Sequence, residues 1–192
     1  MGQEILDGTG TGNRAKVNTN GQLEVKSTII SEYASTSILT GKAWQLHFKR
    51  TFVAANTYEV VGQIEYTGDN SLVLDNVVGA KEDSTLTSSN GQMHFDFAFG
   101  STYVSGGSFQ SAFPINASSN QALVANTYSG VSSAITIDET NREKLFDLVT
   151  DTSVSYDFKN ALILKKGNIL TIKAKTKNIG DICHCALFLY EI

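Results

Sequence analysis

Apolar and polar residues alternate with a period of two along most of the chain. Such alternation predicts β-strands that bury one face. The segments that show it are Gln22–Lys26, Thr57–Thr67, Ser71–Val78, Gln92–Gly100, Ala161–Lys165, Ile169–Lys177 and Ile182–Tyr190, with shorter strands expected around Tyr103 and Ile135. Strands at roughly ten-residue spacing, separated by turn residues, favour an all-β fold, an antiparallel β-sandwich or jelly roll.

The last two predicted strands carry additional information. Lys166-Gly167-Asn168 separates Ala161–Lys165 from Ile169–Lys177 and reads as the turn of a β-hairpin. The final segment is apolar on both faces, with Cys183, Cys185, Leu187 and Leu189 opposed to Ala186, Phe188 and Tyr190. This pattern predicts a central strand, or a strand whose second face lies in a subunit interface. Phe188 and Tyr190 are therefore candidate oligomer contacts.

One segment has the start signal of a helix. Thr140-Asn141-Arg142-Glu143 fits a capping box, and Leu145, Phe146, Leu148 and Val149 follow it. We therefore expect at most one short helix, beginning near Thr140, in an otherwise β-rich chain.

Residues 1–21 differ from the rest because they contain little to bury. Glycines alternate with other residues in the run from Asp7 to Asn13, and an ordered glycine loses much backbone entropy. We interpret residues 1–21 as an extended arm that becomes ordered against a partner, and residues 22–192 as a single β-sandwich domain. The candidate partner-binding residues of the arm are Asp7, Gly8, Gly10, Gly12, Asn13 and Arg14.

Composition narrows the classes of function. The chain has 192 residues, with 15 Lys and Arg against 19 Asp and Glu, a net charge of −4. Nucleic-acid binders usually carry a basic excess, so we expect no nucleic-acid partner. No apolar run approaches the ~20 residues of a membrane span, and the first residues lack the pattern of a secretory signal. The expected setting is therefore a reducing cytosol, without a membrane.

No motif predicts catalysis or a cofactor. The glycine run fails as a dinucleotide motif because Asn13 stands where a glycine is required, and because a strand follows it. Cys183-His184-Cys185 looks like a metal cluster, but a strand would point His184 away from both thiols, and zinc needs three or four converging ligands. We expect no catalytic residue, no cofactor-binding residue and no metal ligand.

Two surface readings stay open. Trp44, Tyr103, Phe109 and Tyr128 could stack on sugars, although such rings more often pack in a β core. Five lysines between Lys165 and Lys177 would form a basic edge on the predicted hairpin, which discourages edge-to-edge pairing or docks an acidic neighbour.

Both ends of the chain resemble a known class of proteins. The first stretch runs Asp7-Gly8-Thr9-Gly10-Thr11-Gly12-Asn13-Arg14-Ala15-Lys16-Val17-Asn18, followed by Asn20-Gly21-Gln22-Leu23-Glu24-Val25, and the second is ALILKKGNILTIKAKTK at residues 161–177. They resemble segments of virion structural proteins from tailed bacteriophages. The resemblance implies a β-rich head or tail component, made in the host cytoplasm and incorporated into the virion.

Within that class, the resemblance and the arm favour a non-enzymatic capsid decoration (cement) protein. Its expected partners are the major capsid protein or other virion subunits, and copies of itself, with a homotrimer favoured. A tail, baseplate or adaptor component is the first alternative. A carbohydrate-binding jelly-roll adhesion module is the second, and an enzyme is the least favoured.

Overall fold

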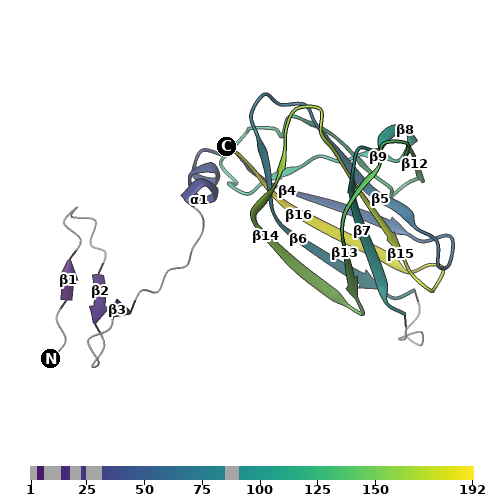
Figure 1. Cartoon of the computed structure of the whole chain (residues 1–192), viewed down its shortest axis with the longest axis horizontal. Coiled ribbons are helices and arrows are strands. Elements are labelled where there is room, and N and C mark those ends of the chain that lie inside the picture. Colours follow the sequence, from purple (N-terminus) through teal and green to yellow (C-terminus); the bar gives the residue numbers. More distant parts are fainter. Residues whose placement is uncertain (1–3, 7–13, 18–22, 25–31, 85–90) are drawn as a thin grey trace. The chain divides into compact units, whose positions relative to one another are not determined.

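The computed structural model describes the backbone of residues 4–6, 14–17, 23–24, 32–84 and 91–192. Side chains are described from residue 36 onward within these ranges, residues 160–161 excepted. The chain divides into two compact units, Met1–Glu32 and Tyr33–Ile192 (Figure 1). The predicted domain boundary between residues 21 and 22 lies outside the described residues.

The second unit consists of two antiparallel sheets. One, which we name the β16 sheet, has the order β10 (Phe113–Pro114), β4 (Ala43–Thr51), β16 (Ile182–Glu191), β6 (Leu72–Glu82) and β14 (Ser153–Leu164). The other, the β15 sheet, has the order β13 (Glu143–Thr150), β7 (Met93–Phe99), β15 (Ile169–Lys175), β5 (Glu59–Tyr66), β11 (Ala125–Ser129) and β9 (Ser108–Phe109). Two further strands, β8 (Thr102–Gly106) and β12 (Ile135–Asp138), pair with each other.

The strand order identifies the type of sandwich. Eight strands give the orders β4-β16-β6-β14 and β5-β15-β7-β13, with successive strands distributed between the two sheets. This arrangement of interleaved Greek keys is a jelly roll. The predicted all-β antiparallel sandwich is therefore confirmed. The last strand lies between β4 and β6, as a central strand should (Figure 1).

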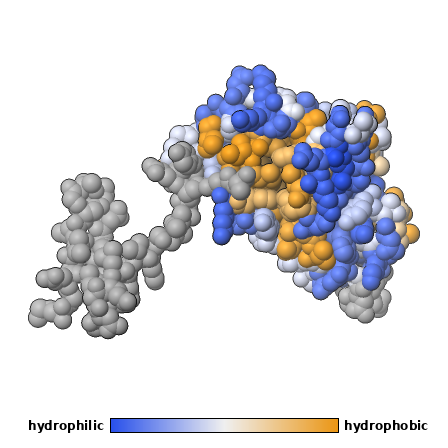
Figure 2. All heavy atoms as spheres, in the orientation of Figure 1, coloured by the Kyte–Doolittle hydropathy of each residue, from blue (hydrophilic) through white to orange (hydrophobic). Residues whose placement is uncertain are grey.

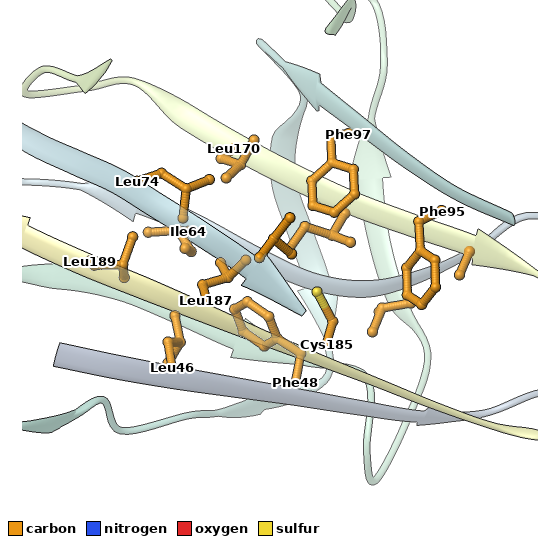
Figure 3. Packing of buried hydrophobic residues seen from close by; sticks show 14 of the residues in the cluster. Leu46, Phe48, Ile64, Leu74, Phe95, Phe97, Leu170, Cys185, Leu187 and Leu189 are labelled. Carbon is orange, nitrogen blue, oxygen red and sulfur yellow. The ribbon is translucent and has the colours of Figure 1, made fainter. Parts of the chain in front are cut away.

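The core fills the space between the sheets. Met93, Phe95 and Phe97 of β7 point inward, as their alternation predicts, and all three are buried. Leu170, Ile172 and Ala174 of β15 do the same. They meet inward side chains of the β16 sheet, among them Leu46, Phe48, Leu74, Cys185, Leu187 and Leu189 (Figure 3).

Aromatic rings pack where the edge strands of the two sheets run next to each other. Phe146 of β13 stacks on Phe97 with ring centroids 4.4 Å apart. It also packs edge-to-face against Phe158, with ring centroids 5.1 Å apart. Tyr156 of β14 also stacks on Phe146, at 5.6 Å. Figure 2 shows hydrophobic residues over the side where β13 and β14 lie in Figure 1, between hydrophilic residues. These rings join the two edges of the sandwich.

The helix expected from Thr140 is wrong, because this segment is the edge strand β13. The Thr140 hydroxyl donates to Asp138, so it does not cap a helix. A bulge between Lys144 and Phe146 shifts the register against β7. It interrupts the alternation of period two, so that Leu145, Phe146 and Leu148 acquire a spacing that resembles one face of a helix.

The expected hairpin around Gly167 is also wrong in its pairing. β14 pairs with β6 and β15 pairs with β5 and β7, so the two strands belong to different sheets. The turn itself is present, with Gly167 at φ 83° and the Asn168 amide donating to the Lys165 carbonyl. It carries the chain across the sandwich. The neighbouring lysines therefore do not form a hairpin edge, because β15 is an interior strand.

The described helix, α1 (Glu32–Leu39), lies immediately before β4. The Ser37 hydroxyl donates to the Glu191 carbonyl at 2.8 Å, and Ile38 packs against Ala43, Val73 and Tyr190. Gly41, at φ 77°, follows the helix in the left-handed conformation that often ends one. α1 thus covers one end of the outer surface of the β16 sheet.

The described residues of the first unit form three short strands, β1 (Glu4–Leu6), β2 (Arg14–Val17) and β3 (Leu23–Glu24). β2 pairs antiparallel with both of the others. Of the predicted partner-binding residues, Arg14 begins β2, and Asp7, Gly8, Gly10, Gly12 and Asn13 lie outside the described residues. The segment expected as an extended arm therefore has backbone pairing of its own in its described residues.

Candidate functional site

The outer surface of the β16 sheet is the main candidate for a binding site. On β16, Ile182, His184, Ala186 and Phe188 point away from the core and are all partly exposed. The register places Ala186 between His47 of β4 and Val78 of β6. We call this surface the open face; it comprises Gln45, His47, Lys49, Asn76, Val78, Ala80, Glu82, Ile182, His184, Ala186 and Phe188.

The open face has an apolar centre and a polar margin. Phe188 and Ala186 lie on the middle strand, flanked on one side by Val78. Gln45 is exposed beside Phe188, and Glu82 is exposed beside Ile182 at the far end of the face. The outer residues of the edge strand β14 are exposed as well. An apolar centre surrounded by polar residues is the usual composition of a protein–protein contact surface.

The two predicted oligomer contacts have different surroundings. Phe188 lies on the open face, between Gln45 and Asn76, and is partly exposed. Tyr190 lies between Ala43 and Val73 and is only 3% exposed, because Ile38 of α1 packs over this cluster. The chain's own helix thus occupies the position beside Tyr190, and of the two residues only Phe188 presents its ring to the outside.

A pair of histidines occupies the open face. His47 of β4 and His184 of β16 stack with ring centroids 5.4 Å apart, and Nε2 of His47 lies 3.3 Å from Nδ1 of His184. Nε2 of His184 lies 3.1 Å from a carboxylate oxygen of Glu82. Burial, together with the nearby His184 and Lys49, lowers the pKa of His47 below its ordinary value. The imidazole of His47 is therefore mostly neutral at pH 7.

The two cysteines do not contribute to this surface. Cys183 and Cys185 point into the core, are fully buried and form no disulfide. Figure 3 shows the sulfur of Cys185 among core side chains. Burial raises the pKa of both thiols. The prediction that His184 points away from both sulfur atoms is confirmed, and the thiols have no activating environment.

Buried charges elsewhere hold loops in place. Glu59 accepts hydrogen bonds from the Arg50 guanidinium and from the backbone amides of Val53 and Ala54. At the other end of β5, the Tyr66 hydroxyl donates to Glu191 at 2.8 Å. Because their partners lie within the sandwich or its turns, these groups stabilise the fold rather than form a site.

The outer surface of the β15 sheet carries a network of opposite charges. Arg142 pairs with Asp96, and Lys173 pairs with Glu139 at 2.9 Å. The Lys175 ammonium lies 4.7 Å from the ring centroid of Tyr58. Of the five lysines expected to form a basic edge, Lys173 and Lys175 therefore have partners on this surface, and Lys166 pairs with Asp69. These contacts make the surface less suited to an acidic partner than the number of lysines indicates.

The rings considered as sugar platforms are mostly engaged. Trp44 is buried at 1% exposure, and its indole N–H donates to the Gln121 carbonyl. Tyr103 and Tyr128 stack on each other with centroids 3.9 Å apart. Phe109 differs, because it is 66% exposed on the edge strand β9. Phe109 is thus the one residue of the four that offers a largely uncovered ring.

The described ranges contain neither a cluster of metal ligands nor a membrane-spanning helix. Within them, no three His, Cys, Asp or Glu side chains of one chain are grouped so as to hold a metal ion. No helix in the same part of the chain combines the length and apolarity needed to cross a bilayer.

No protein-family model, curated protein or solved structure matches this chain. Any inference about the function of this chain therefore starts from its sequence, its fold and the open face.

Proposed function

We propose that this chain is a non-enzymatic structural protein of a tailed-phage virion, a capsid decoration protein that binds the head lattice. The observation that carries the proposal is the open face, where the central strand of a jelly roll presents Phe188 and Ala186 outward. The sequence resemblance of residues 7–25 and 161–177 supports the virion setting. Jelly rolls occur in viral capsid proteins and also in lectins, so the fold is compatible with this role without requiring it.

In this proposal the sandwich associates with copies of itself through the open face. Covering Phe188, Ala186 and Val78 removes apolar surface from water, and the polar residues at the margin stay hydrated. The partner is a second copy because the face carries both charges, with Lys49 on the β4 side and Glu82 on the β6 side of β16. A two-fold axis parallel to β16 would place the Lys49 side of one copy over the Glu82 side of the other.

The N-terminal segment supplies the attachment to the shell. Its expected partners are the major capsid protein or other virion subunits, which it contacts through Asp7, Gly8, Gly10, Gly12, Asn13 and Arg14. Short strands such as β1 and β3 can add to a neighbouring sheet by backbone hydrogen bonds. Several weak contacts of this kind, repeated over a lattice, bind firmly through avidity.

A second candidate function is carbohydrate binding, and exposed aromatic rings favour it. Phe109 on β9 and Phe113 on β10 are 66% and 60% exposed. They lie at edges of the two sheets and are four positions apart in sequence. Saturable binding on a glycan array, lost in Phe109→Ala, would support this adhesion role.

The test of the decoration role uses purified full-length protein and phage heads. We expect heads lacking decoration to bind it, and deletion of residues 2–20 to reduce occupancy while the sandwich stays folded by circular dichroism. Full occupancy by the truncated protein would refute attachment through the N-terminal segment. Binding to tails rather than heads, seen by electron microscopy, would replace the decoration role with a tail, baseplate or adaptor role.

Self-association has a separate test. Native mass spectrometry of the full chain should give a dimer joined by the two-fold contact of the open faces, in place of the homotrimer favoured from the sequence, and Phe188→Lys should give monomers. A trimer would indicate a head-to-tail contact and would overturn the two-fold arrangement. Gln92→Lys is the matched control, because Gln92 is exposed next to β7 in the other sheet. A wild-type chain that is monomeric at high concentration would overturn association through the open face.

A further inference from the structure

We propose that His47 and His184 form half of a binding site for a divalent transition metal, and that a second copy of this chain completes it. The inference rests on the proposed self-association through the open face. The ion would lie between two open faces, where each copy contributes two imidazole nitrogens.

The spacing of the two nitrogens matches a chelating pair. Nε2 of His47 and Nδ1 of His184 are 3.3 Å apart. Two ligands at about 2.0–2.1 Å from a tetrahedral Zn²⁺ lie about 3.3–3.4 Å from each other, so the observed separation fits one ion. The same separation also suits an N–H···N hydrogen bond between the rings, and a metal ion that takes this position would displace its proton.

Glu82 supplies the group that usually supports a metal-bound histidine. Its carboxylate lies 3.1 Å from Nε2 of His184 and accepts a hydrogen bond in the tautomer that carries the proton on Nε2. This hydrogen bond leaves Nδ1 as the nitrogen with a lone pair, and Nδ1 is the atom that faces His47. Carboxylates that orient ligating imidazoles in this way are common around metal sites.

One copy alone does not provide a complete site. Structural metal sites take four protein ligands and catalytic ones three, whereas the described residues of one chain bring together two imidazoles here. The side chain of His184 is 28% exposed, on a surface that we propose meets another copy. A second pair of imidazoles brought to the same point would give four nitrogens around the ion.

The neighbouring residues fit this role. Ala186 lies next to His47 in the register, so a small side chain leaves room for a second copy to approach. Lys49 lies opposite His184 and adds a positive charge that opposes metal binding, while Glu82 offsets it.

The experiment titrates metal-free full-length protein with ZnCl₂ and measures bound Zn²⁺ and oligomer mass together. We expect fewer ions than chains at saturation, one for every two chains in the pairwise site, with an increase in the associated fraction. His47→Gln and His184→Gln should each lower Zn²⁺ affinity at least tenfold. His94→Gln, on the outer surface of the β15 sheet, is the matched control and should bind as the wild type does.

Several outcomes would overturn the inference. No Zn²⁺ binding, or binding unchanged in His47→Gln and His184→Gln, would refute the site. One ion per chain with no change in mass would refute sharing between copies. Association that is equal with Zn²⁺ and with a chelator, yet lost in Phe188→Lys, would remove the metal site and leave the proposed self-association intact.

Discussion

A Cβ atom placed on Gly62 would lie 2.3 Å from Cγ of Phe48. The two residues belong to opposite sheets, Gly62 to β5 and Phe48 to β4. The relationship recurs in reverse, because Gly79 of β6 lies against the ring of Phe95 of β7. Each sheet thus supplies a glycine that receives a phenylalanine ring from the other sheet, and these two contacts allow the sheets to approach closely.

Gly62→Ala should therefore destabilise the fold through overpacking, by about 1–3 kcal/mol in the free energy of unfolding. Urea denaturation followed by tryptophan fluorescence measures this, since Trp44 is buried. Gly167→Asn is the control, because an added Cβ meets nothing within 4 Å there and Asn tolerates the left-handed conformation. Equal stability of the wild type and Gly62→Ala would contradict the contact.

The buried ion pair between Arg50 and Glu59 leads to a second prediction. Arg50 is 6% exposed, and Glu59 also holds the amides of Val53 and Ala54. Glu59→Leu leaves a buried guanidinium without its partner and should cost about 3–5 kcal/mol of stability. Asp69→Asn, which breaks the exposed pair with Lys166, should leave the melting temperature unchanged. A small effect of Glu59→Leu would show that water replaces the lost partner.

Asp181 predicts a pH dependence of stability. Burial raises the pKa of Asp181. Hydrogen bonds from Thr176 and from the Ser84 amide, together with the charge of Lys81, lower the pKa by more than burial raises it. The pKa of Asp181 therefore lies below the ordinary 3.8. A lowered folded-state pKa stabilises the protein above pH 3.8, and this stabilisation is lost as the pH falls through the folded-state value.

The measurement for Asp181 is the stability difference between the wild type and Asp181→Asn as a function of pH. We expect the wild type to be more stable at pH 7, and the difference to shrink as the pH falls below 3.8. A stability difference that is constant from pH 7 to pH 2 would show that the charge of the Asp181 carboxylate does not contribute to it.

The thiols of Cys183 and Cys185 should be unreactive in the folded protein. Both are fully buried and burial raises the pKa of each, so the reactive thiolate is scarce. A colorimetric thiol reagent should modify neither cysteine in buffer and both in guanidinium chloride. Rapid modification of the native protein at a rate independent of unfolding would disprove the burial of this face of β16.

The sequence predicts β5, β7 and β15 well because their alternation is regular, but β4 alternates as regularly and is absent from the predicted strands. β7 and β15 alternate without interruption on their inward faces, and their buried residues follow the expected pattern. β13 is not recognised because its bulge breaks the alternation. α1 has a serine-rich and threonine-rich sequence with little intrinsic helix preference, and contacts of Ser37 and Ile38 with the sandwich stabilise it.

The candidate site depends on pairings that local sequence does not contain. Phe188 is recognised from the two-sided apolar pattern of its strand. The partners of His184 are separated from it by 137 residues for His47 and 102 for Glu82, and only the registers of β4 and β6 against β16 bring them together. Tyr190 shares the pattern of Phe188, and its burial follows from α1, a helix absent from the sequence prediction.

The pairing of β4 with β16 has a consequence for how the protein is made. During synthesis, the first strand of the sandwich leaves the ribosome long before its main hydrogen-bonding neighbour, the last one. A contact between strands so distant in the chain forms slowly, and until then the apolar surfaces of both sheets stay incompletely covered. Nascent chains therefore stay vulnerable to aggregation until β16 has been synthesised, and loss of this strand should abolish folding rather than merely weaken it.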